Sequence, residues 1–195
     1  MDQSVIRTMA RWPNVPAVYG WMSLDRRGRW CLQGEPVIHR GAIAFMNSNY
    51  ARTADGQWYF QNGPQRVFVN LDYTPWIYSL DGAGALVDHV ENPVNELRGA
   101  WIDEEGNLLL LGERGIGLLC DRDLGSMSEN LRHSDGAACD EHSVARLIQA
   151  SGSARSRRIC LAWDNKPIEV ELLLRDQVAG KFGFDPRPRV RDDGE

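Results

Sequence analysis

Polar and aromatic side chains gather between residues 58 and 76, and they carry the clearest chemical signal in the sequence. Amides, an arginine and aromatic rings at one end of a sheet can bind a small ligand or a protein partner, because the arginine pairs with an anionic group and the rings pack against the ligand. The same amides can also satisfy the backbone of a loop while the rings fill the core. We predict a binding surface made of Trp58, Gln61, Asn62, Gln65, Arg66, Tyr73 and Trp76.

A second group of chemically active residues lies between residues 133 and 142. His133, Cys139 and His142 supply three nitrogen and sulfur ligands, and Cys120 or Asp140 is available as a fourth. Zinc held there would support a metal-assisted hydrolase. The spacing matches no closed zinc motif, and a solvated loop that leads into a helix explains the same residues. The metal site is therefore an alternative, and we predict no cofactor.

The sequence lacks the recognised catalytic motifs. It contains no Walker-type glycine loop, no Gly-x-Ser-x-Gly elbow, no HExxH and no GxGxxG after a strand. The segment Gly112–Gly117 is rich in glycine, but its spacing does not suit a dinucleotide site and indicates a turn. Asp103 and Glu105 lie in or beside a turn, where carboxylates make local hydrogen bonds, and Asp123 suits the N-cap of a helix. We therefore lean away from an enzyme.

Composition and charge exclude several classes of protein. The chain has 195 residues and a formal net charge of −5, which argues against a general nucleic-acid binder. No apolar run approaches the ~20 residues of a membrane helix, and the first residues lack the apolar core of a signal peptide. Four widely spaced cysteines are typical of reduced thiols. We expect a cytoplasmic bacterial protein with no nucleic-acid partner and no membrane insertion.

The sequence contains an internal repeat. Leu24–Glu35 aligns with Ile102–Glu113 at an offset of 78 residues, with five identities in twelve positions. Arg66–Asp72 aligns with Arg158–Asp164 at an offset of 92, and the alternating apolar pattern repeats with it. The blocks occur in the same order in both halves, so we interpret them as tandem copies of one unit. The alternative is that any two hairpins with an Asp-x-x-Gly turn look alike.

Short alternating strands joined by glycine turns predict antiparallel sheet. Turns of this kind occur at Asp25–Gly28, Thr53–Gly56 and Asp103–Gly106. Helical spacing predicts a helix at 140–150, and a second short helix is expected at 123–131. The predicted fold class is α+β, predominantly antiparallel β, with two tandem similar β-rich units and one or two short helices in the second.

We expect four segments along the chain. They are an N-terminal arm at 1–17, a first β-rich repeat unit at 18–95, a second unit with a helical insertion at 96–176, and a C-terminal tail at 177–195. Exposed strand edges or the aromatic arm would allow a homodimer, in which case the protein has a structural role.

Several segments resemble a known family. The resemblance rests on Gly28-x-Trp30-x-Leu32-x-Gly34-Glu-Pro-Val-Ile38, Asp55–Phe60, Gln65–Val69 and Tyr73–Trp76. They are similar to a proteobacterial family of uncharacterised proteins over about residues 12–125. The pattern is more remotely similar to another bacterial family of unknown function, which is built from repeated β motifs with some helix and has a suggested role in signal transduction. The resemblance implies a tandem β-repeat fold, and it brings no activity, cofactor or catalytic residue.

These observations together favour a non-catalytic module. We expect it to bind a small ligand or a protein partner, with a regulatory or signalling role. The metal-assisted hydrolase and the dimeric structural protein are the alternatives.

Overall fold

The chain folds into two compact units in the computed structural model. The structure describes residue 7 and residues 15–149, 158–164 and 166–190. Met1–Pro75 and Gly183–Glu195 make up the first unit, and Trp76–Phe182 makes up the second. We refer to these as unit 1 and unit 2. The chain therefore passes from unit 1 to unit 2 and returns. Most of the predicted arm at 1–17 lies outside the described residues.

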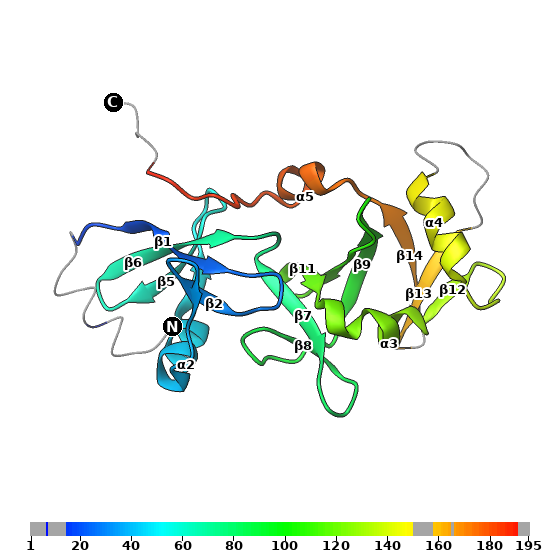
Figure 1. The fold of residues 1–195 in the computed structure, drawn as a ribbon, viewed down its shortest axis with the longest axis horizontal. Helices are drawn as coiled ribbons and strands as arrows, with labels where there is room; N and C mark the ends of the chain where they lie inside the picture. Colours follow the sequence, from blue (N-terminus) through cyan, green and yellow to red (C-terminus); the bar gives the residue numbers. More distant parts are fainter. Residues whose placement is uncertain (1–6, 8–14, 150–157, 165, 191–195) are drawn as a thin grey trace. The chain divides into compact units, whose positions relative to one another are not determined.

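Unit 1 is a six-stranded sheet with one helix packed on it (Figure 1). The strand order is β3-β2-β1-β6-β5-β4, and β1 runs parallel to β6 while all other neighbours are antiparallel. The elements are β1 (Val18–Leu24), β2 (Trp30–Leu32), β3 (Glu35–Pro36), α2 (Arg40–Asn49), β4 (Tyr50–Arg52), β5 (Trp58–Asn62) and β6 (Gln65–Leu71).

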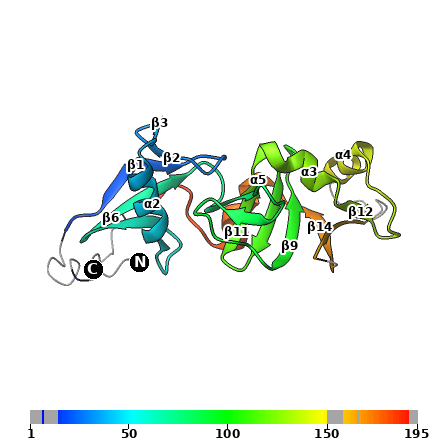
Figure 2. The same ribbon diagram turned by 90° about the horizontal axis from the view of Figure 1, so that it is seen from below.

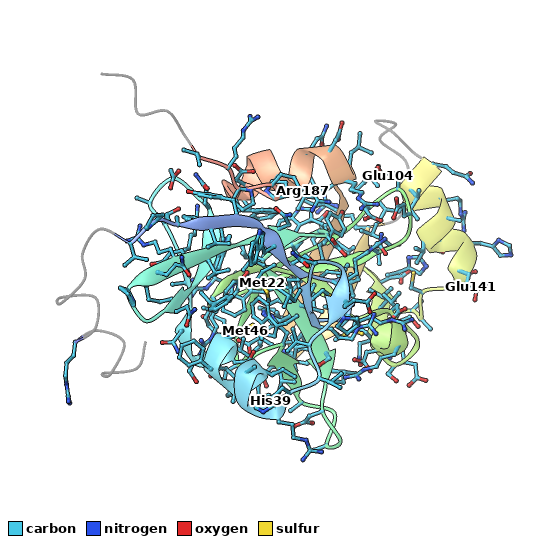
Figure 3. All side chains as sticks on the ribbon, turned by 60° about the vertical axis from the view of Figure 1, so that its left-hand side comes forward. Met22, His39, Met46, Glu104, Glu141 and Arg187 are labelled. Atoms are coloured by element: carbon cyan, nitrogen blue, oxygen red, sulfur yellow. The ribbon has the colours of Figure 1, made fainter. Side chains whose placement is uncertain are left out.

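Aromatic rings fill the space between this sheet and α2. The Trp30 ring meets the Tyr50 ring edge to face, with centroids 5.1 Å apart, and Tyr50 tilts against Trp58 at 4.8 Å. The indole nitrogen of Trp30 also donates to the Asn47 side chain of α2 at 2.8 Å. Met46 of α2 is buried as well, and Figure 3 labels it. Burial of these rings holds α2 to the sheet.

Helix α2 was not predicted from the sequence. Its N-cap is His39, whose ring accepts the backbone N–H of Ala42 at 3.1 Å. Serine, threonine, aspartate and asparagine are the usual N-caps, so histidine gives no start signal. Gly41 early in the helix and the polar residues at its end have low helix propensity. Packing of the apolar side therefore decides the helical conformation.

Unit 2 is an eight-stranded sheet with the order β12-β13-β14-β9-β10-β11-β7-β8. The pairs β14–β9 and β11–β7 are parallel, and the others are antiparallel. Figure 2 shows α3 and α4 at the β12 end of the sheet. The elements are β7 (Trp76–Leu80), β8 (Leu86–Asp88), β9 (Leu97–Ile102), β10 (Leu108–Gly112), β11 (Gly115–Leu119), the 3-10 helix η1 (Asp121–Asp123), α3 (Leu124–Ser128), β12 (Leu131–His133), α4 (Glu141–Gln149), β13 (Ile159–Trp163), β14 (Lys166–Leu172) and α5 (Arg175–Phe182).

Residues 76–95 belong to unit 2, although the sequence placed them in the first repeat unit. Strand β7 pairs with β11, so that Trp76 is opposite Gly117. The buried ring of Tyr78 takes the space in front of two glycines: a Cβ on Gly117 would lie 2.4 Å from it, and one on Gly112 would lie 2.9 Å from its hydroxyl oxygen. The glycines of this segment therefore make room for a core tyrosine, and only the residues between β10 and β11 form a turn.

Six tight turns in the described part of the chain share one hydrogen-bond pattern. The backbone C=O of the first turn residue accepts a hydrogen bond from the N–H of the fourth residue. The N–H of the first residue donates to the C=O of the fifth residue. The fourth residue has positive φ in all six, which explains why five of them are glycine. In five turns a side-chain oxygen of the first residue also accepts the fifth N–H. The turns begin at Asp25, Thr53, Asp81, Asp88, Asp103 and His133, which confirms the three predicted ones.

The two units share a strand topology. The order β3-β2-β1-β6-β5-β4 of unit 1 reappears in unit 2 as β11-β10-β9-β14-β13-β12. The pair Leu24–Trp30 corresponds to Ile102–Leu108, which confirms the offset of 78 in the first repeat block. The same hydrogen bond follows the parallel pair in both units, because Leu24 and Ile102 each accept a backbone N–H at 3.0 Å from the residue after β6 or β14.

The second repeat block was aligned one strand out of place. Met22 pairs with Val69 in unit 1, and the equivalent Ala100 pairs with Val170 in unit 2, which gives an offset of 101 instead of 92. Strand β6 therefore corresponds to β14, whereas the sequence alignment set it against β13. A period-2 apolar pattern recurs in every half-buried strand, so it does not identify one strand among several. Arg66 and Arg158 are consequently not equivalent.

The predicted fold class is confirmed as mostly β with few helices. The helices predicted at 123–131 and 140–150 appear as α3 and α4. Helix α5 begins at Arg175 and extends into the predicted C-terminal tail at 177–195. No helix among the described residues has the length and apolar character needed to span a membrane.

Candidate functional site

The structure places the seven predicted binding residues in different environments. Trp58 and Tyr73 are buried in unit 1, and Trp76 belongs to unit 2. Trp76 donates its indole N–H to a backbone carbonyl at 3.0 Å. The structure brings the other four together on the β5–β6 hairpin, where they form two cross-strand pairs: Gln61 with Arg66, and Asn62 with Gln65.

The hairpin carries a stack of rings that ends in a cation. The guanidinium of Arg66 lies 5.0 Å from the centroid of the Tyr59 ring. Tyr59 tilts against Phe68 at 5.7 Å, and Phe68 stacks on Tyr19 at 4.4 Å. Gln61 is fully buried, and its side-chain oxygen has no hydrogen-bond partner among the described residues. Arg66 is exposed, so its guanidinium is accessible to an anionic group.

The residues of the alternative metal site do not converge. Among the described residues, no group of three or more His, Cys, Asp or Glu side chains is placed to hold a metal ion. His133 is buried and its Nε2 lies 3.2 Å from the Ser143 hydroxyl, whereas His142 is exposed on α4. The Cys139 thiol contacts the backbone carbonyl of Asp140. His133 and Cys139 both interact with Ser143, but together with His142 they form no metal-binding group in the described part of the chain.

Ser143, His133 and Asp140 form a network that resembles a nucleophile with its base. The Ser143 hydroxyl donates to the Asp140 carboxylate at 2.5 Å, and the Ser143 backbone N–H donates to the same oxygen at 2.8 Å. Because the hydroxyl proton points at Asp140, Nε2 of His133 must itself donate to Ser143. His133 cannot then accept that proton as a general base. The network caps the start of α4 instead.

A pocket of about 410 Å³ opens beside this network in unit 2. Its size falls in the range of about 300–1,000 Å³ that is usual for small-molecule sites. Most of the wall is apolar, and the polar side chains come from α3, from the segment before α4 and from the first residue of α4. The lining residues are Ile102, Gly106, Leu108, Leu124, Gly125, Ser128, Leu131, Cys139, Asp140, Glu141 and Val144.

The repeat explains why this pocket is open. Leu108 corresponds to Trp30 of unit 1, because each pairs with the last residue of the neighbouring strand, Ile102 or Leu24. Leu131 corresponds in the same way to Tyr50, through equivalent pairs of β12 with β13 and β4 with β5. In unit 1 the two rings meet edge to face and fill the space below the helix.

The two leucines occupy less volume than the two rings, and they leave the pocket unfilled. The same topology therefore has a packed core in unit 1 and a cavity at the corresponding place in unit 2. Interiors normally close such spaces. A space kept open in one copy and filled in the other is the feature expected of a binding site.

The chain matches one protein-family model along nearly its whole length. The model is DUF2944, described as "Protein of unknown function (DUF2946)", and it covers residues 1–189. The chain belongs to the DUF2944 family. No curated protein matches the chain. The expected resemblance to an uncharacterised family is thereby confirmed.

Two solved structures are remotely similar to this DUF2944 protein. A DUF1285 family protein from Silicibacter pomeroyi DSS-3 is 16% identical, with 84% of this chain and 86% of that chain covered and a TM-score of 0.47. A DUF1285 family protein from Shewanella baltica OS155 is 14% identical, with 54% and 88% covered and a TM-score of 0.40.

Sequence reasoning missed the pocket of the DUF2944 chain, although a signal for it was present. The first repeat block sets Trp30 against Leu108. The difference in side-chain volume was the relevant observation. The second exchange, Tyr50 for Leu131, was not visible because the alignment of the second block did not include β4 or β12.

Proposed function

We propose that the chain is a non-catalytic module that binds a small ligand in the pocket of unit 2. The observation that carries this proposal is the largely apolar pocket of about 410 Å³, which the repeat leaves open where unit 1 packs Trp30 against Tyr50. An apolar wall with a few polar groups at its rim is the usual construction of a small-molecule site. The proposal includes the regulatory role that the sequence analysis predicts for such a module.

The nucleophilic side chains at the pocket support binding over catalysis. The Ser128 hydroxyl donates to the carbonyl of Gly125 at 2.6 Å, and the Ser143 hydroxyl donates to Asp140. Partial burial raises the pKa of the Cys139 thiol, and the nearby Asp140 carboxylate raises it further. A thiol with a raised pKa is a poor nucleophile at neutral pH. None of these three side chains is activated.

A fragment screen tests the proposal. Native mass spectrometry and thermal shift are run on the untagged protein with a set of small apolar compounds, in the wild type and in Leu108→Trp. The variant puts into unit 2 the ring that unit 1 carries at this position, so we expect it to remove binding. Leu32→Trp is the matched control, because it adds the same side chain at an exposed site of unit 1. Fragments that bind all three proteins equally would overturn the proposed site.

The β5–β6 hairpin is a second candidate, for a protein partner. The exposed Arg66 favours it, since its guanidinium presents a positive charge and packs over the buried Tyr59 ring. Titration with a short glutamate-rich peptide tests the idea. Arg66→Gln is expected to weaken binding and to leave the thermal stability unchanged. A loss of stability with no change in binding would assign Arg66 a structural role.

A further inference from the structure

The charges on the pocket wall are all of one sign. Asp140 and Glu141 line the pocket, and no lysine or arginine among the described residues lines it. Both carboxylates belong to exposed residues at the start of α4, and Figure 3 shows Glu141 there. The rest of the wall is formed mainly by aliphatic side chains, such as Ile102 and Leu124. A ligand in this pocket therefore meets apolar surface along its body and negative charge at the rim.

Asp140 keeps its charge, and one of its oxygens accepts no hydrogen bond from the residues that the structure describes. The two hydrogen bonds from Ser143 lower the pKa of its carboxyl group, so the group is ionised at neutral pH. Both bonds end on Oδ1. Capping of α4 accounts for the hydrogen bonds to Oδ1, but it does not involve Oδ2. The basic groups that act on Asp140 are His142 and Arg146, and the Arg146 side chain donates to the carbonyl of His142.

We infer that the ligand of this pocket has an apolar body and a positively charged head, such as a protonated amine or a quaternary ammonium group. This inference rests on the proposed function and names its ligand class. The aliphatic wall takes the body, which leaves water. The head lies beside the carboxylates of Asp140 and Glu141. An anionic head of the same size is repelled there, so charge complementarity selects between the two.

Three probes that share one ring system test the head group. They are 1-naphthylmethylamine as the cation, 1-naphthylmethanol as the neutral compound and 1-naphthylacetate as the anion. Dissociation constants are measured by calorimetry or by ligand-observed NMR. We expect the cation to bind about threefold more tightly than the neutral probe and about tenfold more tightly than the anion, because each exposed charge contact changes affinity by a factor of a few.

Two sets of variants separate the contribution of the carboxylate charges to binding from the contribution of the cavity. Asp140→Asn combined with Glu141→Gln keeps the hydrogen-bond acceptors, since asparagine also caps helices. In this variant we expect the cation to bind no more tightly than the neutral probe, whose affinity stays unchanged. Leu108→Trp fills the cavity and is expected to weaken all three probes. Val144→Phe fills it from α4 and serves if the tryptophan variant does not fold.

The outcomes distinguish the two proposals. If all heads bind equally and the filling variants remove binding, the pocket is a small-molecule site and the ligand class is wrong. The same conclusion follows if the anion binds most tightly. If the filling variants leave the binding of every probe unchanged, or if no probe binds in the millimolar range, both the site and the ligand class are overturned. Preference for the cation, lost in the carboxylate variant, supports both.

Discussion

Replacing Gly56 by alanine tests how unit 1 holds the chain segment that follows α5. Gly56 has a φ of +89°, and an added Cβ would lie 2.4 Å from the carbonyl oxygen of Gly183. The carbonyl oxygen belongs to the backbone and the position of a Cβ is fixed by the backbone, so no rotamer change relieves the clash. The segment is attached by two backbone hydrogen bonds, from Asp185 to Gly56 at 3.0 Å and from Leu71 to Pro186 at 2.9 Å. The substitution is expected to detach it.

The size of the effect follows from these contacts. An alanine at this φ is strained by about 1–2 kcal/mol. Loss of two backbone hydrogen bonds adds about 0.5–1.5 kcal/mol each. We therefore expect Gly56→Ala to lower the free energy of unfolding of unit 1 by about 2–5 kcal/mol. Gly34→Ala is the matched control, because Gly34 has the same φ of +89° in the same unit and nothing lies within 4 Å of its added Cβ.

Urea unfolding followed by tryptophan fluorescence measures both variants, with Trp30 and Trp58 as probes of unit 1. Amide exchange adds a local measurement, since the N–H groups of Leu71 and Asp185 should lose protection only in Gly56→Ala. We expect Gly34→Ala to show the strain alone, about 1–2 kcal/mol. Equal destabilisation by the two substitutions, with the two amides still protected, would refute the reasoning.

Three further predictions concern unit 2. Gly117→Ala places a Cβ within 2.4 Å of the Tyr78 ring, and urea unfolding should show that the free energy of unfolding falls by about 3 kcal/mol. Gly180→Ala in α5 is the control, because the added Cβ has open space there. It should raise the free energy of unfolding by about 0.5–1 kcal/mol. Burial lowers the pKa of His89 to about 3, so as pH falls below about 6.5 the unfolded chain takes up a proton that the folded chain does not. Stability should then fall by about 1–2 kcal/mol at pH 5, and a His89→Asn variant with the same pH dependence would contradict this assignment. Hydrogen bonds from the third residue of α4 lower the pKa of Asp140, so its stabilisation of α4 is complete above about pH 4 and is lost as pH falls through the lowered pKa. Amide exchange in the first turn of α4 measures that loss, which Asp140→Ala should show at every pH.

The turns of this chain could be predicted because their chemistry is local. Asp25, Thr53 and Asp103 each accept the N–H of the fifth residue of the turn, and a glycine in the fourth position supplies the positive φ. Three turns were missed. The one at Asp81 carries the same aspartate and glycine signal, the one at Asp88 has Glu91 in the fourth position, and the one at His133 begins with a residue that lacks that oxygen. The His133 side chain is used elsewhere, in the bond to Ser143.

The site was harder to predict because it depends on volume and on register. Helix α2 lacks a usual cap, and only packing against the rings of unit 1 selects it. The pocket arises where Leu108 and Leu131 replace Trp30 and Tyr50, two exchanges that lie on strands far apart in the sequence. Recognising the pair requires the correct strand equivalence. The pairing register supplies that equivalence, and the alternating apolar pattern does not.

The order in which the chain is made has a consequence for its folding. Unit 2 is one continuous stretch, Trp76–Phe182, inserted into the sequence of unit 1. During synthesis all six strands of unit 1 leave the ribosome first, yet the partner of its Gly56 carbonyl and its Leu71 N–H comes from residues 183–190. Unit 2 has all its residues before that partner is made. The nascent chain therefore completes the unit that it started second before the unit that it started first.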